Sequence, residues 1–120
     1  MWRRLGYRRD IRQLVGLSDV SVSSSRQEGL PINLVEAMAL GNPVVATDVR
    51  GNRDLVQDGE SGYLVPLNDS RAMAERIWSL YTDPEQTAAF GVVGRTLAQD
   101  YAVEPVLHRT IEIYQALELL

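Results

Sequence analysis

Several residue types that carry chemistry are missing or rare in this chain of 120 residues. It contains no cysteine, which excludes a disulfide, a thiolate nucleophile and a cysteine-bound metal. Its one histidine, His108, lies far from every motif described below, so we expect a structural or surface role for it. A cluster of histidine ligands is equally excluded. The sequence therefore points away from thiol chemistry and from metals held by cysteine or histidine.

Excess positive charge is also missing. The net charge of −4 argues against general nucleic-acid binding. Residues 1–13 are the exception, because this segment contains five arginines and Asp10 as its one acidic residue. The arginines are Arg3, Arg4, Arg8, Arg9 and Arg12. We favour a solvated surface for this basic segment. The alternative is a contact with phosphates or with an anionic membrane surface.

Long apolar runs are missing as well. The most apolar window, residues 30–47, is interrupted by proline, glycine, asparagine and Glu36, so it is not a membrane span. The first residues begin charged, but the apolar segment of a secretory signal does not follow them. We therefore expect a cytoplasmic protein. Peripheral contact at the inner membrane surface is the alternative that the basic segment leaves open.

What the chain does contain is a turn that leads into an apolar helix, residues 28–41. Pro31 suits the first helical position, and Gly41 suits the position just past the end. Apolar residues nearly fill the segment between them, which predicts a helix buried on all sides. Asn33 and Glu36 nevertheless share one of its faces. Because a buried carboxylate needs a partner, this face meets solvent or a structural arginine, or it faces a polar ligand.

Strands and helices alternate along the rest of the chain. The alternation at 20–23 predicts a strand, the short β-branched run at 43–47 predicts a strand buried on both faces, and a further short strand is expected at 63–65, with a weaker strand at 1–5. Helices are expected at 10–16, 31–40 and 52–57, followed by three helices that begin near Asp69, Asp83 and Pro105. The expected fold is one α/β domain with a Rossmann-like parallel sheet, flanking helices and a C-terminal helical cluster.

Two features of the C-terminal helices carry specific expectations. Trp78 and Tyr81 accompany the apolar residues Met73, Ile77 and Leu80, so we interpret both rings as core residues and not as a sugar platform. Gly91 and Gly94 weaken the next helix, which predicts close packing or a kink there.

The loops at 23–29, 47–52 and 66–69 follow the carboxyl ends of the predicted strands, where parallel sheets bind ligands. Backbone N–H groups of Gly29 and Leu30 can donate to a phosphate, and carboxylates can accept from the hydroxyls of a ribose or another polyol. Two carboxylates also suggest glycoside hydrolysis, which a neighbouring phosphate cradle disfavours. No G-x-G-x-x-G or Walker loop supports a nicotinamide or P-loop nucleotide.

The segment from Glu28-Gly29-Leu30-Pro31 through Glu36-Ala37-Met38-Ala39-Leu40-Gly41 resembles the Glu-x7-Glu motif of retaining GT-B glycosyltransferases, those of glycosyltransferase family 4. The likeness continues in order along nearly the whole chain, at Leu5–Ile11, Ser18–Val20, Pro43–Asp48, Gly51–Asp54 and Asp58–Pro66. Asp54 stands where that family more often has glutamate.

The resemblance implies that the chain binds a nucleotide-diphosphate sugar. Glu36 would bind the ribose hydroxyls, and Glu28 would hold the transferred sugar near its anomeric carbon as the catalytic residue. The other implied donor-binding residues are Gly29, Leu30, Pro31 and, near the base, Arg8. The reaction implied is transfer of a hexosyl group with retention of configuration, and no metal or other cofactor is expected.

The resemblance also implies that residues 1–120 form the later part of a donor domain. The first βα unit of that domain, with its basic pair for the diphosphate, and the acceptor domain for a glycan or lipid are expected to lie outside the chain. We expect a glycosyltransferase fragment that is inactive alone. The alternative is a non-catalytic or vestigial nucleotide-sugar-binding domain. Exposed Tyr114, Leu119 and Leu120 on the last helix, which in the family crosses to the partner domain, are expected to favour self-association.

Overall fold

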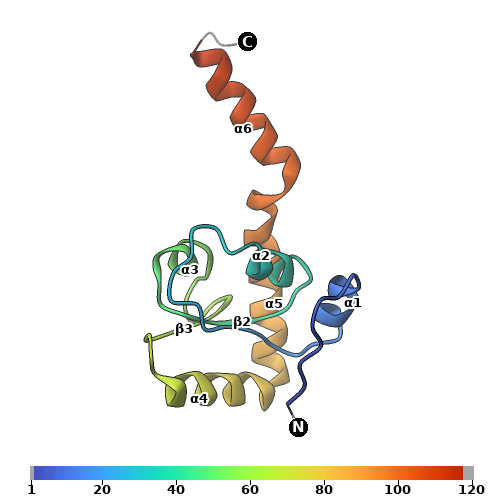
Figure 1. Cartoon of the computed structure of the whole chain (residues 1–120), viewed down its shortest axis with the longest axis vertical. Coiled ribbons are helices and arrows are strands. Elements are labelled where there is room, and N and C mark those ends of the chain that lie inside the picture. The colour runs from blue at the N-terminus through green and yellow to red at the C-terminus, as the bar shows by residue number, and fades with distance from the viewer. Residues whose placement is uncertain (1, 118–120) are drawn as a thin grey trace.

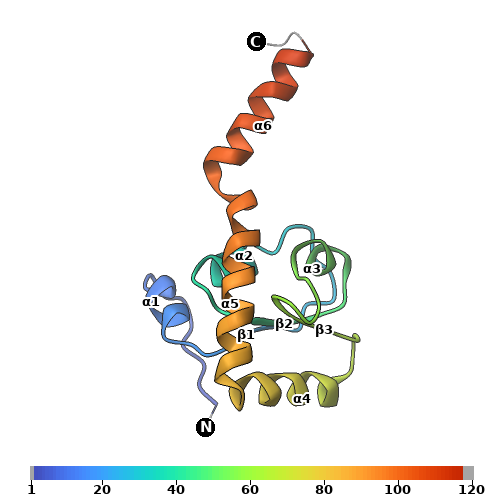
Figure 2. The same cartoon turned by 180° about the vertical axis from the view of Figure 1, so that it is seen from behind.

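The computed structural model describes residues 2–117, without the side chains of 103–108 and 114. Its body is a small parallel sheet packed between helices, and helix α6 (Val103–Ala116) projects away from that body (Figures 1 and 2). Of the described helices, none combines the length and apolarity that a membrane crossing requires. The expectations for His108, Tyr114, Leu119 and Leu120 fall outside the described side chains.

Three strands form the sheet in the order β1-β2-β3: β1 (Ser21–Ser23), β2 (Val44–Thr47) and β3 (Gly62–Val65). Both pairs are parallel, with Val22 opposite Val45 and Val45 opposite Tyr63. Helices α2 (Ile32–Ala39) and α3 (Arg50–Leu55) connect the strands. The predicted α/β fold is therefore confirmed.

The weak strand predicted at the N-terminus is wrong. Residues 2–10 have no strand assignment, and Trp2 and Leu5 are 80% and 51% exposed. A strand needs a neighbouring backbone to complete its hydrogen bonds, and this segment pairs with none of the described strands. Helix α1 (Ile11–Gly16) follows where a helix was predicted, but none of its residues is buried.

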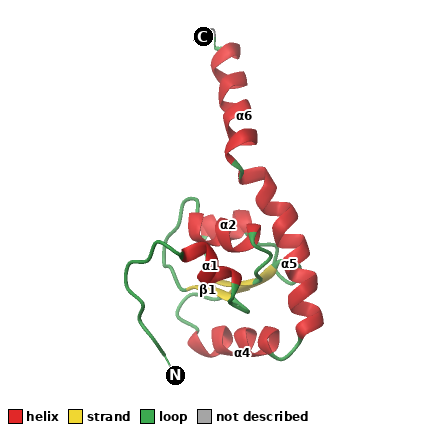
Figure 3. Cartoon of the chain, turned by 90° about the vertical axis from the view of Figure 1, so that its right-hand side faces the viewer, coloured by secondary structure: helices red, strands yellow, loops and turns green. Residues whose placement is uncertain are grey.

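Strand β2 lies at the centre of the core, and all four of its residues are buried. On one face, Val44 and Ala46 pack with the buried residues of α2, α3 and the end of α5 (Pro84–Ala98). On the other face, Val45 packs with Leu80 of α4 (Ser70–Tyr81) and Phe90 of α5. Figure 3 shows α2 and α4 on opposite sides of the sheet, with α5 running along one end.

Helix α2 differs from the prediction in two ways. Pro31 is its N-cap, so the helix begins at Ile32. It is buried on one face only, through Leu34, Ala37 and Met38, whereas Asn33 and Glu36 are exposed. The cost of a buried acid therefore does not arise. Sequence composition concealed this face, because apolar residues such as Ile32 also stand on the exposed side.

The other helix boundaries follow local capping chemistry. The carboxylates of Asp69 and Asp83 accept from the N–H groups of Ala72 and Gln86 at 2.9 and 3.1 Å, as the sequence predicts. Helix α3 begins at Arg50, earlier than predicted, and α6 begins at Val103 instead of Pro105.

Gly91 confirms close packing of α5, because a methyl group there would overlap the carbonyl of Gly41. A methyl group on Gly94 would make only an ordinary contact with the Met38 side chain, at 3.6 Å. Gly41 itself has φ of 77°, a conformation that suits glycine after a helix.

The prediction that Trp78 and Tyr81 lie in the core is wrong. Their side chains are 65% and 61% exposed, and their ring centroids are 5.8 Å apart. They lie beside Asp19 and Val20, next to the edge strand β1. Among the described strands none pairs with the outer side of β1, so the sheet does not extend beneath these two rings.

Candidate functional site

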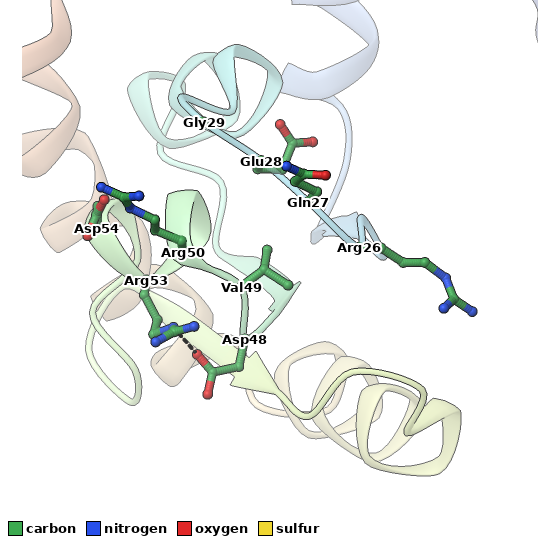
Figure 4. Close-up of a pocket in the computed structure, with 9 residues that line it drawn as sticks. All are labelled: Arg26, Gln27, Glu28, Gly29, Asp48, Val49, Arg50, Arg53 and Asp54. Carbon is green, nitrogen blue, oxygen red and sulfur yellow. Dashed lines mark ion pairs between the residues drawn. The ribbon is translucent and has the colours of Figure 1, made fainter.

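Because the strands are parallel, the loops after β1, β2 and β3 lie at the same end of the sheet, beyond the carboxyl ends of the strands. A cavity of about 630 Å³ lies between the loop that follows β1 and the segment that joins β2 to α3. Figure 4 shows the residues that line it, which are Arg26, Gln27, Glu28, Gly29, Asp48, Val49, Arg50, Arg53 and Asp54. We call it the Glu28 cavity. The third loop, at 66–69, lines a smaller adjoining hollow that shares Arg26.

The Glu28 side chain is half-buried and held by a short chain of hydroxyls. Ser25 Oγ donates to Glu28 Oε1 at 2.7 Å, and Ser23 Oγ lies 3.1 Å from Ser25 Oγ. For Glu28 Oε2, no partner is recorded among the residues that the structure describes. The carboxylate is therefore fixed through one oxygen while the other is available to a hydroxyl donor.

The backbone around Glu28 is fixed by the neighbouring segment. The N–H of Gly51, in the first turn of α3, donates to the carbonyl of Glu28 at 3.1 Å. The hydroxyl of Thr47 donates to the carbonyl of Ser25. A side chain at Gly51 would overlap the carbonyls of Glu28 and Gly29, so only glycine permits this approach.

Charge in the Glu28 cavity is mixed. Arg53 and Asp48 form an ion pair at 2.9 Å, with their side chains 59% and 49% exposed. Such an exposed pair contributes roughly 0–1 kcal/mol. Figure 4 shows the Arg26 side chain pointing away from Glu28. The cations around this cavity therefore do not converge on one point beside Glu28.

Glu36 lies on the exposed face of α2 and lines a different cavity, of about 490 Å³, between α1 and α2. The other residues around this Glu36 cavity are Arg9, Ile11, Arg12, Val15, Ala39 and Leu40. Its walls combine apolar side chains with two arginines. The structure thus places the two predicted acids at separate hollows and not in one pocket.

The N-terminus of α2 lies between the two glutamates in the chain. No side chain caps it, and no acceptor is recorded within the described residues for the N–H groups of Gly29 and Leu30. Leu30 is 51% exposed. Pro31 is fully buried, so it directs the chain into the helix and offers no accessible surface. Free N–H groups at a helix start favour an anion.

Arg8 lines neither of the two glutamate cavities among the described residues. Its guanidinium binds Asp10, with an N···O distance of 2.6 Å, and this hydrogen bond lowers the pKa of the Asp10 carboxyl. Asp10 stands at the N-cap of α1, but its side chain makes no capping hydrogen bond there. The role of Arg8 near a base stays a prediction.

Sequence reasoning missed the arginines that do line the cavities. Arg9 and Arg12 border the Glu36 cavity, although we interpreted their segment as a solvated surface. Arg50 and Arg53 border the Glu28 cavity. The available signal for the second pair was their place just beyond the carboxyl end of a predicted strand.

Comparison with known proteins identifies the setting of this site. A family model described as "Glycosyl transferases group 1" matches residues 2–83. The putative glycosyltransferase EpsD of Bacillus subtilis (strain 168) is 42% identical over 111 residues, which are 92% of this chain and 29% of that protein. The chain therefore spans less than a third of this relative.

Solved structures agree with the family match. HepE from Anabaena, in complex with UDP, has a TM-score of 0.89 at 31% identity, over 93% of this chain and 31% of that chain. Its complex with UDP-glucose has a TM-score of 0.86. The C-terminal domain of LpcC from Francisella tularensis has a TM-score of 0.74 at 25% identity, over 85% of this chain and 53% of that domain. The parallel sheet with flanking helices is thus that of GT-B glycosyltransferases, and the chain belongs to the glycosyl transferases group 1 family.

Proposed function

We propose that this chain forms the donor side of the active site of a retaining glycosyltransferase and binds a nucleotide-diphosphate sugar. One observation carries the proposal. Along the chain, Glu28 precedes and Glu36 follows the uncapped N-terminus of α2, and each borders its own cavity. An acceptor for hydroxyls, a set of free N–H donors and a second acceptor for hydroxyls match sugar, diphosphate and ribose in that order.

In this proposal the transferred sugar lies in the Glu28 cavity and the nucleoside lies toward the Glu36 cavity. The diphosphate lies at the N–H groups of Gly29 and Leu30, where the helix dipole favours negative charge. The complexes of Anabaena HepE with UDP and with UDP-glucose support this class of donor.

The proposed reaction breaks the bond between the anomeric carbon and the donor phosphate oxygen. The acceptor oxygen bonds to the same face of that carbon, its proton passes to the leaving diphosphate, and the nucleoside diphosphate departs. The Glu28 carboxylate lies near the anomeric carbon in this arrangement and stabilises the positive charge that develops there. No step requires a metal or another cofactor.

We further propose that the 120 residues bind the donor weakly and transfer nothing when isolated. In this proposal, contacts to a glycan or lipid acceptor belong to a part of the enzyme outside this chain, which covers 29% of the length of EpsD. A domain that only binds nucleotide sugars would show the same binding. Addition of purified chain to UDP-glucose and a mixture of acceptor glycosides tests the proposed inactivity, because release of UDP with formation of a glycoside would contradict it.

The binding site itself is tested by calorimetry with UDP and with UDP-glucose. We expect Glu36→Gln to weaken both ligands about tenfold, since each contains the ribose whose hydroxyls donate to the carboxylate. Glu28→Gln should weaken UDP-glucose by a similar factor and leave UDP unchanged. The matched control is Glu60→Gln, an exposed glutamate outside both cavities. Failure of the wild-type chain to bind either ligand, or equal affinities in all variants, would overturn the proposal.

A further inference from the structure

We propose that Asn52, which lines neither cavity, is a positioning residue. It fixes the loop between β1 and α2 that carries Glu28, here called the Glu28 loop, by way of Thr47 and Ser25. The significance for catalysis rests on the function proposed above, but the mechanical coupling does not. Asn52 is fully buried in α3, at 0% exposure. It therefore acts on a donor only through the groups that it holds.

The coupling begins at the end of β2. Asn52 Nδ2 donates to the Thr47 carbonyl at 2.9 Å and lies 3.4 Å from Thr47 Oγ1. The hydroxyl of Thr47, itself 4% exposed, donates to the carbonyl of Ser25. The side-chain hydroxyl of Ser25 then donates to the Glu28 carboxylate at 2.7 Å. These hydrogen bonds, joined through the covalent bonds of Thr47 and Ser25, connect a buried amide with the carboxylate in the cavity.

A second path starts in the same turn of α3. The N–H of Gly51, the residue beside Asn52, donates to the Glu28 carbonyl at 3.1 Å. Because the Gly51 backbone packs tightly against the carbonyls of Glu28 and Gly29, a shift of this turn displaces the loop. Because Asn52 Nδ2 ties this turn of α3 to Thr47, we extend its positioning role to the backbone of Glu28 as well as to the carboxylate.

The need of the Thr47 carbonyl for a hydrogen-bond donor does not explain an asparagine at position 52. The Thr47 carbonyl already accepts from the Val49 N–H at 2.9 Å, so it would keep a donor without Asn52. Asn52 Oδ1 is buried and has no recorded partner in the described chain. An unpaired buried oxygen is destabilising. The bond from Nδ2 to Thr47 is the contact that the side chain makes in return.

Asn42 provides a matched control within the same chain. It is also buried, at 4% exposure, and its Nδ2 donates to the Val15 carbonyl at 3.0 Å and to Ser21 Oγ at 3.1 Å. Its Oδ1 likewise lacks a recorded partner. Asn42 thus has the same chemistry as Asn52, but it tethers α1 to β1 and contacts no residue of the Glu28 loop in these bonds.

The mechanical part is tested by amide hydrogen exchange of the unliganded chain, followed by NMR. Asn52→Ala should accelerate exchange of the Gly51 N–H at least tenfold relative to the amides of the β2–β3 ladder, and Asn42→Ala should not. Thr47→Val, which keeps the shape and removes the hydroxyl, should have the same local effect and decides the matter if Asn52→Ala does not fold. Unchanged relative exchange at Gly51 in Thr47→Val would overturn the coupling.

The catalytic significance is tested by affinities for UDP and UDP-glucose. Asn52→Ala should weaken UDP-glucose and leave UDP unchanged, and adding it to Glu28→Gln should cause no further loss, because Asn52 acts through Glu28. Equal losses for both ligands, or full additivity with Glu28→Gln, would contradict a positioning role. If the wild type binds neither ligand, the proposed function fails while the exchange result still decides the coupling.

Discussion

The two glutamates of the motif are placed by different physical means. Glu36 lies on a regular helix whose buried face is Leu34, Ala37 and Met38, so its direction follows from the helix itself. Glu28 lies on a loop, where the backbone alone does not fix a side chain, and it is held by Ser25 and by Gly51. A functional side chain on a loop therefore needs tethers that one on a packed helix does not.

The helices that form the walls beside the two glutamates also differ in how many residues they bury. Helix α3, beside Glu28, buries Gly51, Asn52 and Leu55, although it is only six residues long. Helix α1, beside Glu36, has the same length and buries none of its residues. The sugar side of the proposed site is thus rigidly backed, and the nucleoside side has a loosely packed wall.

The largest effect expected from this comparison is that of Gly51→Ala. Its methyl group would overlap the carbonyls of Glu28 and Gly29, so the turn and the loop must separate. Overpacking of this kind destabilises by about 1–3 kcal/mol. Urea unfolding of the wild type and the variant measures the change. Gly29→Ala is the control, because a side chain there meets open space and should change the free energy of unfolding by less than about 0.5 kcal/mol. Equal stabilities of the two variants would contradict a rigid wall beside Glu28.

A smaller difference is expected between the two walls in amide exchange of the native chain. The N–H of Leu14 in α1 donates to the carbonyl of Asp10, the N-cap, and the N–H of Val56 donates to the carbonyl of Asn52 at the end of α3. Because α1 buries no residue, we expect Leu14 to exchange at least about tenfold faster than Val56, after correction for intrinsic rates. Similar protection at both sites would show that α1 is as firmly packed as α3.

Much of the fold follows from local signals in the sequence. Alternation at 20–23 and the short apolar segments at 43–47 and 63–65 predict the three strands, and Asp69 and Asp83 predict where α4 and α5 begin. The predictions that were wrong concern exposure, which depends on the tertiary environment. The exposure of Glu36 and of Trp78 is decided by which elements are present to cover α2 and α4, and spacing along one helix does not contain that information.

The site was predictable to a similar extent. The spacing of Glu28 and Glu36 and the position of Gly29 are visible in the sequence. The tether from Asn52 through Thr47 is not, since it joins residues from separate elements by side-chain bonds. For Arg8, the local charge pattern favoured a solvated surface, and the family resemblance implied a place near the base. In the structure its guanidinium pairs with Asp10 two residues away, a contact that neither signal predicted.

The smallest expected effect concerns that pair, at the turn that leads into the wall beside Glu36. The hydrogen bond from Arg8 lowers the pKa of Asp10, so Arg8→Ala should raise it toward the usual value, as measured by NMR titration of the Asp10 carboxyl. Arg12→Ala is the control, since Arg12 forms no recorded ion pair within the described residues. An equal shift in both variants would assign the effect to general charge and not to the hydrogen bond.

The sign of the pH dependence follows from the lowered pKa. The pair contributes stability above the unfolded-state pKa of Asp10, and that contribution is lost as pH falls through the lower pKa of the folded state. Because the two side chains are 41% and 42% exposed to solvent, salt screens their attraction and the change in unfolding free energy stays small. Amide exchange in α1 should consequently respond to Arg8→Ala, while the amides of α3, which belong to the other wall, should not. A response in α3 would mean that α1 and α3 are coupled despite their different packing.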